Sequence, residues 1–293
     1  MADLLAIGSG HLSARINPLG AELWSLTDAA GRELTTDADP AFWTGHAPVL
    51  FPIVGRLRGD SYRLNGREYS LPQHGFARRS MFRIAAQDDA SGLFRLDADE
   101  ETQRVYPFDF RLDMAFAVEG VSLSMTATVM NRGSEDMPFS FGFHPAFAWP
   151  LPYGGKKEEH RVLFERDEPA PLRKVGIEPG LISHKRVPSP VRGNALAPTH
   201  DMFGHDALIW DDLNSRRLKW GAPGHPLLDI AFPDTPWLGL WQKPGAHYLC
   251  IEPWAGMADP EGFDGDIWMK PGIMRLEPGA QHSFRLNIRL VEN

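Results

Sequence analysis

Three short segments of the chain carry side chains that suit acid–base chemistry. Residues 71–78 (Leu-Pro-Gln-His-Gly-Phe-Ala-Arg) place an amide, an imidazole and a guanidinium close together. Residues 141–147 (Phe-Gly-Phe-His-Pro-Ala-Phe) set a second histidine among aromatic rings, and residues 250–254 (Cys-Ile-Glu-Pro-Trp) set a carboxylate beside a tryptophan. These groups suit a neutral ligand with many hydroxyl groups whose protons must be moved. The pattern predicts a sugar site that catalyses proton transfer.

His144 and Glu252 are the candidate proton-transfer groups. His144 follows an apolar, strand-like run and lies where that strand must end, because Pro145 cannot continue a β-ladder. Functional side chains often occupy such junctions. Glu252 has an apolar run before it and Pro253 after it, so we expect it at a second strand end. Its apolar neighbours favour a raised pKa, which a general acid or base acting near neutral pH requires.

Each candidate also has a purely structural interpretation. His144 could be a hydrogen-bonded core histidine, and Glu252 could pair with one of the arginines. Residues 73–78 could be an ordinary polar loop, and Arg56 simply follows an apolar run and a glycine. The repetition of complementary chemistry at four expected strand ends favours one shared site over four unrelated explanations.

The composition excludes several classes of protein. The 293 residues carry a net charge of −8, whereas a nucleic-acid-binding surface is normally basic. The only cysteine, Cys250, excludes an internal disulfide and lies in an apolar run, so we expect a buried core residue. The sequence has no signal-peptide pattern at its start and no apolar stretch long enough to span a membrane. These features predict a cytoplasmic protein without nucleic-acid or membrane partners.

Alternation of apolar and polar residues predicts an all-β fold. Period-2 patterns occur at residues 123–129 and 284–290, which gives each strand one apolar and one polar face. Many short strands with turn signals between them predict a large antiparallel sandwich or barrel. Residues 150–198 are rich in proline, glycine and charge, which indicates long loops and edge strands. Because the alternation resumes afterwards, we expect a single domain over residues 1–293.

Two local elements follow from the turn and capping residues. Residues 62–69 predict a β-hairpin, because the Asn-Gly pair at its centre supplies the positive φ angles of a type I′ turn. Helical periodicity is otherwise scarce. The best short helix candidate is residues 39–43, where Asp39 suits the N-cap and Pro40 the first helical position.

These motifs resemble the aldose 1-epimerase (galactose mutarotase-like) superfamily, most closely its LacX-like branch. The general pattern matches over essentially the whole chain, and the most specific motifs are Gln-His-Gly-Phe-Ala-Arg at residues 73–78 and Glu-Pro-Trp-Ala-Gly-Met-Ala-Asp at residues 252–259. The resemblance implies a large antiparallel β-supersandwich that holds a sugar on a concave sheet face. It implies that His144 is the general acid and Glu252 the general base. It also implies ligand-binding roles for Arg56, Gln73, His74, Arg78 and Asp206.

The chain departs from the galactose mutarotase motif in two places. Phe143 precedes the histidine where that motif has asparagine, and Phe76 replaces the second glycine of a His-Gly-Gly run. These departures leave the identity of the sugar open. Residues 73–78 are also similar to the hexose-6-phosphate mutarotase branch, in which arginines help to hold the phosphate.

The reaction implied by the resemblance explains the residue types. An aldopyranose changes anomer when its ring opens at C1, rotates about the C1–C2 bond and closes on the other face. Opening removes the C1 hydroxyl proton, a step assigned to Glu252, and protonates the ring oxygen, a step assigned to His144. No metal or organic cofactor is needed. The expected partner is an aldohexose, free or phosphorylated, and the expected assembly is a monomer or homodimer.

Two other classes of function remain open. His74, His144 and Glu252 could form a 2-His-1-carboxylate metal site, as in a β-sandwich dioxygenase, although no short His-x-His or His-x₃-His spacing supports it. A non-catalytic sugar binder or sensor would use the same residues without proton transfer. Hydrolysis by paired carboxylates is disfavoured, because it needs two carboxylates and Glu252 is the only one that the sequence strongly indicates at the site.

Overall fold

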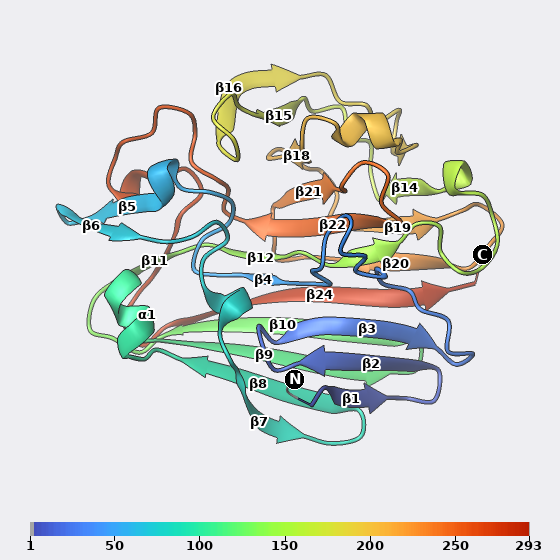
Figure 1. Ribbon diagram of the computed structural model, residues 1–293, viewed down its shortest axis with the longest axis horizontal. Helices are drawn as coiled ribbons and strands as arrows, with labels where there is room; N and C mark the ends of the chain where they lie inside the picture. Colours follow the sequence, from blue (N-terminus) through green and yellow to red (C-terminus); the bar gives the residue numbers. More distant parts are fainter. Residues whose placement is uncertain (1–2, 293) are drawn as a thin grey trace.

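The structure, a computed structural model, describes residues 3–292 and consists mainly of antiparallel β-strands (Figure 1). The one α-helix in this range is α1 (Glu100–Val105), whose first turn is capped because the Asp99 side chain accepts a hydrogen bond from the Thr102 backbone. The other helical segments are 3₁₀ turns: η1 (Arg58–Asp60), η2 (Ala77–Arg79), η3 (Lys157–Glu159), η4 (His200–Phe203) and η5 (Ile267–Met269). Within the described residues, no helix is long and apolar enough to cross a membrane. The all-β prediction is confirmed.

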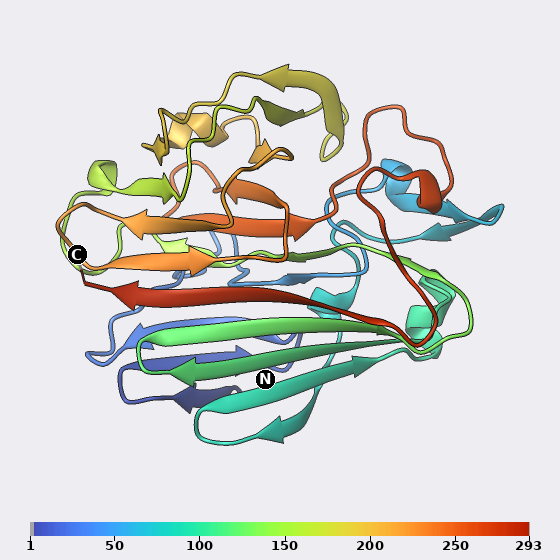
Figure 2. The same cartoon turned by 180° about the vertical axis from the view of Figure 1, so that it is seen from behind.

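A nine-stranded sheet forms one large layer of the molecule. Its strands follow the order β17 (Ala195–Leu196), β14 (Arg161–Phe164), β19 (Arg217–Gly221), β20 (Leu227–Ala231), β24 (Gln281–Val291), β10 (Ser122–Asn131), β9 (Phe110–Glu119), β8 (Ser91–Asp97) and β7 (Arg83–Gln87). Figure 2 shows the long strand β24 between β20 and β10. The two period-2 segments pair with each other, with Met125 opposite Leu286, and both side chains are buried. The alternation therefore predicted the buried face correctly.

A three-stranded sheet covers part of this layer. It consists of β1 (Leu5–Gly8), β2 (Leu12–Asn17) and β3 (Glu22–Asp28), and it lies over β8, β9 and β10 (Figures 1 and 2). The apolar side chains of Ile7 and Ile16 belong to the same buried cluster as Met114 and Phe116 on β9. This cluster extends along the chain as far as Ile288.

An eight-stranded sheet forms the second large layer and carries the candidate site. Its main path is β16 (Ile182–Val187), β15 (Leu172–Val175), β18 (Leu208–Trp210), β21 (Trp237–Trp241), β22 (Tyr248–Ala255), β12 (Phe141–Phe143) and β4 (Val49–Leu50), and β13 (Ala146–Ala148) also pairs with β22. Two small sheets complete the fold: β5 (Ser61–Leu64) with β6 (Arg67–Ser70), and β11 (Met137–Phe139) with β23 (Met274–Leu276). Strands β16 and β17 lie at sheet ends, so the prediction of edge strands within residues 150–198 is confirmed.

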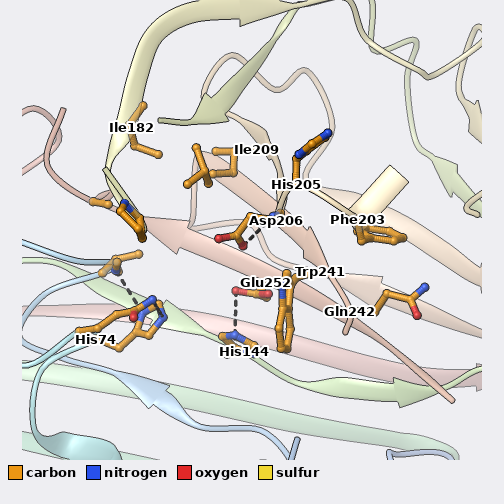
Figure 3. Close-up of a pocket in the computed structure, with 18 of the residues that line it drawn as sticks. His74, His144, Ile182, Phe203, His205, Asp206, Ile209, Trp241, Gln242 and Glu252 are labelled. Atoms are coloured by element: carbon orange, nitrogen blue, oxygen red, sulfur yellow. Dashed lines mark hydrogen bonds and ion pairs between the residues drawn. The ribbon is translucent and has the colours of Figure 1, made fainter. Parts of the chain in front are cut away.

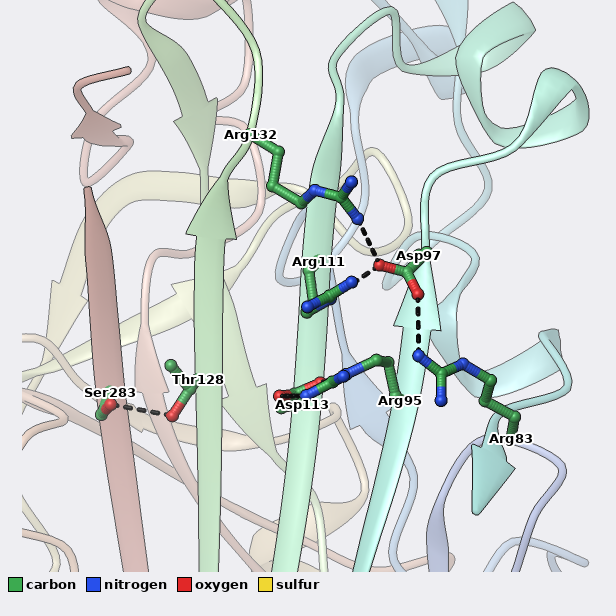
Figure 4. A network of polar contacts seen from close by, with 8 residues as sticks. All are labelled: Arg83, Arg95, Asp97, Arg111, Asp113, Thr128, Arg132 and Ser283. Atoms are coloured by element: carbon green, nitrogen blue, oxygen red, sulfur yellow. Dashed lines mark hydrogen bonds and ion pairs between the residues drawn. The ribbon is translucent and has the colours of Figure 1, made fainter. Parts of the chain in front are cut away.

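The outer face of the nine-stranded sheet carries paired polar side chains (Figure 4). Arg95 on β8 lies opposite Asp113 on β9 and donates two hydrogen bonds of 2.6 Å to its carboxylate. On the same face, Thr128 lies opposite Ser283, and their hydroxyl groups are 2.9 Å apart. Nearby, the Asp97 carboxylate accepts hydrogen bonds from three arginines. Paired charges of this kind suit a sheet face that is exposed to solvent.

The two local predictions have different outcomes. The hairpin of β5 and β6 is confirmed, because Asn65 and Gly66 have φ angles of 50° and 81°. The short helix expected at residues 39–43 is wrong, because the chain makes a single turn in which the Asp39 carbonyl accepts from the Trp43 backbone. The turn does not continue into a helix, and the Trp43 ring lies over Gly45, where a Cβ atom would be 2.3 Å from Cζ2.

Candidate functional site

A cavity of about 730 Å³ lies over the eight-stranded sheet (Figure 3). This volume falls within the range of about 300–1,000 Å³ that is usual for small-molecule sites. Its floor includes side chains of β21 and β22, and its walls include residues 73–79, 175–180 and 203–207. Six of the seven residues predicted for the site line this cavity: Gln73, His74, Arg78, His144, Asp206 and Glu252.

Strand β22 brings Glu252 to the cavity floor. Glu252 and Trp254 are two residues apart on this strand, so their side chains lie on the same face of the sheet. Gly239 on β21 is the residue opposite Glu252, and Ile209 on β18 lies opposite Gly239. Because Gly239 has no side chain, the indole ring of Trp254 can lie over it beside the carboxylate.

Glu252 lies within β22 rather than at its end, so the predicted strand end is wrong for this residue. The strand continues through Pro253, which pairs with Leu238 on one side. On the other side, the Ile251 N–H donates to the Pro145 carbonyl, and Pro253 faces the break between β12 and β13. No ladder N–H is required at such a break, so proline is tolerated inside the strand. The strand end predicted for His144, between β12 and β13, is confirmed.

His144 and Glu252 form a buried pair. The imidazole Nε2 lies 3.2 Å from the carboxylate Oε2, and the two side chains are 9% and 3% exposed. Burial raises the pKa of Glu252 well above its usual range; Asp206 adds to this effect and Arg78 opposes it. Burial lowers the pKa of His144 to about 3, and the charge of Arg78 acts in the same direction. Burial therefore favours a neutral pair with one proton held between the two groups.

Aromatic rings enclose this pair. The His144 ring centroid lies 5.1 Å from that of Trp43 and 6.0 Å from that of Trp241, and the His74 ring lies 5.9 Å away on another side. Sequence reasoning missed Trp43 and Trp241. The run Trp-Leu-Gly-Leu-Trp at residues 237–241 carried a usable signal, because its alternation places two indole rings on one sheet face with a gap between them.

His74 is held as a neutral hydrogen-bond donor. Its Nδ1 lies 3.1 Å from the Gly55 backbone N–H, which donates to it, so the ring proton must lie on Nε2. Burial lowers the pKa of His74 well below its usual range, and the charges of His144 and Arg78 add to this effect. Gln73 Nε2 lies 3.3 Å from His74 Nε2, so an amide turned by 180° would accept the ring proton.

The backbone beside His74 needs an unusual conformation. His74 and Gly75 have φ angles of 66° and 70°. A Cβ atom at Gly75 would lie 2.2 Å from the Phe51 carbonyl oxygen, so only glycine allows this close approach. The His-Gly pair therefore turns the imidazole toward the cavity while its loop packs against the strand end at Phe51.

The two predicted arginines have different surroundings. Arg78, in η2, lines the cavity. Burial and the charge of Arg79 lower the pKa of its guanidinium, and the carboxylates of Glu22 and Glu252 oppose this effect. Arg56 is not brought together with the other predicted residues, because it is not part of the cavity lining. Its guanidinium donates two hydrogen bonds, of 2.9 and 2.8 Å, to Asp60 and a third to the Pro179 carbonyl. Arg56 therefore supports the loop that forms one cavity wall.

Asp206 lies on the exposed rim of the cavity, across from Glu252 (Figure 3). It has a φ angle of 90°, and its Oδ1 accepts a hydrogen bond of 2.8 Å from the Ala207 backbone. The second carboxylate oxygen has no such bond within the loop. Asp206 is therefore placed to accept a ligand hydroxyl group while its charge raises the pKa of Glu252.

The geometry does not match the 2-His-1-carboxylate arrangement considered from the sequence. Within residues 3–292, the group of potential metal ligands on this floor is His144, Cys250 and Glu252, whose donor atoms lie within 4.8 Å of one another. His74 is not part of it, and its Nδ1 already accepts the Gly55 N–H. Cys250 is fully buried, as predicted.

The sequence matches the family described as aldose 1-epimerase over residues 3–264. The chain belongs to the aldose 1-epimerase family. The chromosomal protein LacX of Lactococcus lactis is 31% identical over 280 residues, which cover 92% of this chain and 93% of LacX. The uncharacterized protein YphB of Escherichia coli is 29% identical over 82% of each chain.

Solved structures place the chain in the same fold as galactose mutarotase-like proteins. A galactose mutarotase related enzyme from Lactobacillus acidophilus superposes with a TM-score of 0.90 and is 32% identical, with 98% of this chain and 97% of that chain covered. A galactose mutarotase-like protein from Lactobacillus casei has a TM-score of 0.88 and is 30% identical, with 98% and 100% covered. The predicted family and the predicted galactose mutarotase-like fold are both confirmed.

Proposed function

We propose that this member of the aldose 1-epimerase family is a mutarotase that interconverts the α and β anomers of an aldohexose. The observation that carries the proposal is the buried His144–Glu252 pair, with 3.2 Å between Nε2 and Oε2, on the floor of a sugar-sized cavity. Anomer exchange needs two proton transfers at neighbouring oxygens, O1 and O5 of the ring. A buried acid–base pair suits this need.

In the proposed mechanism, the sugar enters between the two groups and replaces their direct hydrogen bond. Glu252 as carboxylate takes the O1 proton, and His144 as imidazolium donates a proton to O5 while the C1–O5 bond breaks. The products are an open-chain aldehyde, a carboxylic acid and a neutral imidazole. After rotation about C1–C2 the reverse transfers close the ring on the other face, so the pair holds one proton in every state. The Arg78 charge favours the carboxylate form of Glu252 but disfavours the imidazolium form of His144.

Other cavity residues hold the sugar hydroxyl groups in this proposal. His74 donates through Nε2–H, and Asp206 accepts at the rim. The rings of Trp43 and Trp241 keep water away from the reacting groups. Each correctly placed acid or base contributes roughly 10²–10⁴-fold, which suffices for a reaction that already proceeds slowly in water.

A phosphorylated aldose is the second candidate substrate. Arg79 and Lys243 line the same cavity as Arg78 and would provide further positive charge for a phosphate dianion. Arg56, in contrast, is engaged by Asp60 outside the cavity lining, which favours the unphosphorylated sugar.

The test is a screen of freshly dissolved aldohexoses and their 6-phosphates by polarimetry and by NMR of the anomeric protons. The proposed function requires faster anomer equilibration of at least one sugar without added metal. A protein that binds a sugar but leaves its mutarotation rate unchanged would instead be a sugar binder or sensor.

A further inference from the structure

Three potential metal ligands lie together at the cavity floor, where His144 and Glu252 line the cavity and Cys250 is fully buried. Cys250 and Glu252 are two residues apart on β22 and therefore point to the same side of the sheet. His144 enters from the break between β12 and β13, where Ala146 lies opposite Cys250. One donor atom from each of the three side chains lies within 4.8 Å of the other two. The fold thus places the Cys250 thiol next to the His144 imidazole and the Glu252 carboxylate.

The distances in this group are close to those of a tetrahedral zinc site. Zinc binds histidine nitrogen and carboxylate oxygen at about 2.0–2.2 Å, so two such ligands are about 3.4 Å apart around a tetrahedral ion. The separation between His144 Nε2 and Glu252 Oε2 is 3.2 Å. These two ligands already have the required spacing, and only the Cys250 sulfur has to move closer.

The group also has unsatisfied bonding capacity. Within residues 3–292, His144 Nδ1 and Glu252 Oε1 are buried without any hydrogen-bond partner. A buried polar atom without a hydrogen-bond partner costs free energy. An ion that moves these two side chains therefore breaks no hydrogen bond at His144 Nδ1 or Glu252 Oε1. Both side chains line the cavity, which gives an ion a route to them.

From this geometry we propose that His144, Cys250 and Glu252 form a binding site for a soft divalent cation such as Zn²⁺. Binding replaces the thiol proton of Cys250 and the proton shared by His144 and Glu252, so two protons are released for each ion. The thiolate and the carboxylate then balance the two positive charges, which suits a buried site. A fourth coordination position would be left for water.

Such an ion blocks proton transfer, because it occupies the lone pairs of both His144 and Glu252. The site is therefore inhibitory, and the ion competes with the sugar. The inhibition part of the inference rests on the proposed mutarotase function, whereas the binding part rests on the positions of the three side chains alone.

The test begins with the full chain after treatment with a chelator. Titration with Co²⁺ is expected to give a near-ultraviolet absorption band from thiolate to cobalt, with one ion per chain. Calorimetry with Zn²⁺ is expected to show one site, and Cys250→Ser should remove the cobalt band and weaken Zn²⁺ binding by at least about tenfold. His11→Ala, at an exposed position, is the control for binding by surface histidines and should match the wild type.

The outcomes separate binding from function. Co²⁺ binding without a thiolate band, or equal Zn²⁺ affinity in Cys250→Ser, would overturn the site. If near-ultraviolet circular dichroism shows that Cys250→Ser is misfolded, Cys250→Ala replaces it with the same expectations. Zn²⁺ should raise the apparent KM for the sugar in the wild type and have a smaller effect in the serine variant. If no aldose is turned over, the binding measurements still decide the site, and only the proposed function fails.

Discussion

The indole ring of Trp254 lies against the backbone of Gly239 on the neighbouring strand. A Cβ atom at Gly239 would lie 2.6 Å from Cη2 and 2.7 Å from Cζ2 of this ring. Gly142, on the other side of β22, has a similar relationship, because its Cβ would lie 2.6 Å from Trp254 Cδ1. Two glycines therefore allow one large aromatic side chain to extend across the cavity floor, two residues from Glu252.

Gly239→Ala is expected to displace the Trp254 ring and to disturb the floor beside Glu252. Overpacking of this kind costs about 1–3 kcal/mol, so the free energy of unfolding in denaturant titrations should fall by that amount. KM for the sugar should rise as well. Gly133→Ala is the matched control, because its Cβ would have its nearest contact at an ordinary 3.4 Å. Wild-type stability and KM in Gly239→Ala would mean that the ring does not depend on this glycine.

Glu252→Gln and His144→Asn should each lower kcat by at least about 10²-fold while sugar binding survives. Both substitutions keep the approximate shape of the side chain and remove its ability to transfer a proton. Turnover is measured by polarimetry and binding by NMR or calorimetry. Glu119→Gln, on the exposed end of β9, serves as a control and should retain full activity. Near-normal turnover in either site variant would remove that residue from the mechanism.

The stability of the protein should depend on the protonation of His144. Its pKa is lowered from 6.5 to about 3 by burial, so between these pH values the unfolded chain binds a proton that the native protein does not. Stability contributed by the neutral ring is present above the unfolded pKa and is lost as the pH falls. The expected slope is about 1.4 kcal/mol per pH unit around pH 4.5.

The measurement for this prediction is denaturant unfolding of the wild type and of His144→Asn between pH 7 and pH 4. The difference between the two proteins reports on His144 together with its partner Glu252, since His74 contributes a change of the same sign to both. The wild type should lose stability relative to the variant as the pH falls. Parallel stability curves would show that His144 gains its proton as readily in the native protein as in the unfolded chain.

Arg78→Ala separates a neutral hexose from a phosphorylated one. If Arg78 holds a phosphate, the variant should weaken binding of a hexose 6-phosphate by about 1.5–3 kcal/mol, the range for hydrogen bonds to charged groups. Binding of the parent hexose should barely change. Calorimetry measures both, with Arg104→Ala at an exposed position of α1 as the control. Equal losses for both sugars would mean that Arg78 supports the ring or the Glu252 carboxylate rather than a phosphate.

Several features of the fold could be predicted because they depend on neighbouring residues alone. The pleat of a strand has a period of two, so the buried faces of β10 and β24 were visible in the sequence. The Asn65–Gly66 turn requires positive φ angles, and it was predicted correctly. The junction at His144 was predicted for a similar reason, because proline interrupts a ladder locally.

Other features depended on which strands pair. The same proline argument failed at Glu252, because Pro253 faces a break in the adjacent ladder and β22 continues past it. Arg56 follows a motif that resembles a binding segment, yet its guanidinium is engaged by Asp60 and by the loop at Pro179. The break that faces Pro253 and the contact of Arg56 with Pro179 are set by segments distant in the sequence, whereas Asp60 is only four residues from Arg56.

The sequence by itself determined the residue types of the site, the all-β class and the faces of the central strands, because these follow from local backbone geometry and side-chain chemistry. Only the tertiary structure decided that Glu252 and His144 lie 3.2 Å apart, that Trp43 and Trp241 enclose them, and that Cys250 is their neighbour. Long-range strand pairing sets these positions, and the resulting burial moves the pKa of Glu252 upward and that of His144 downward.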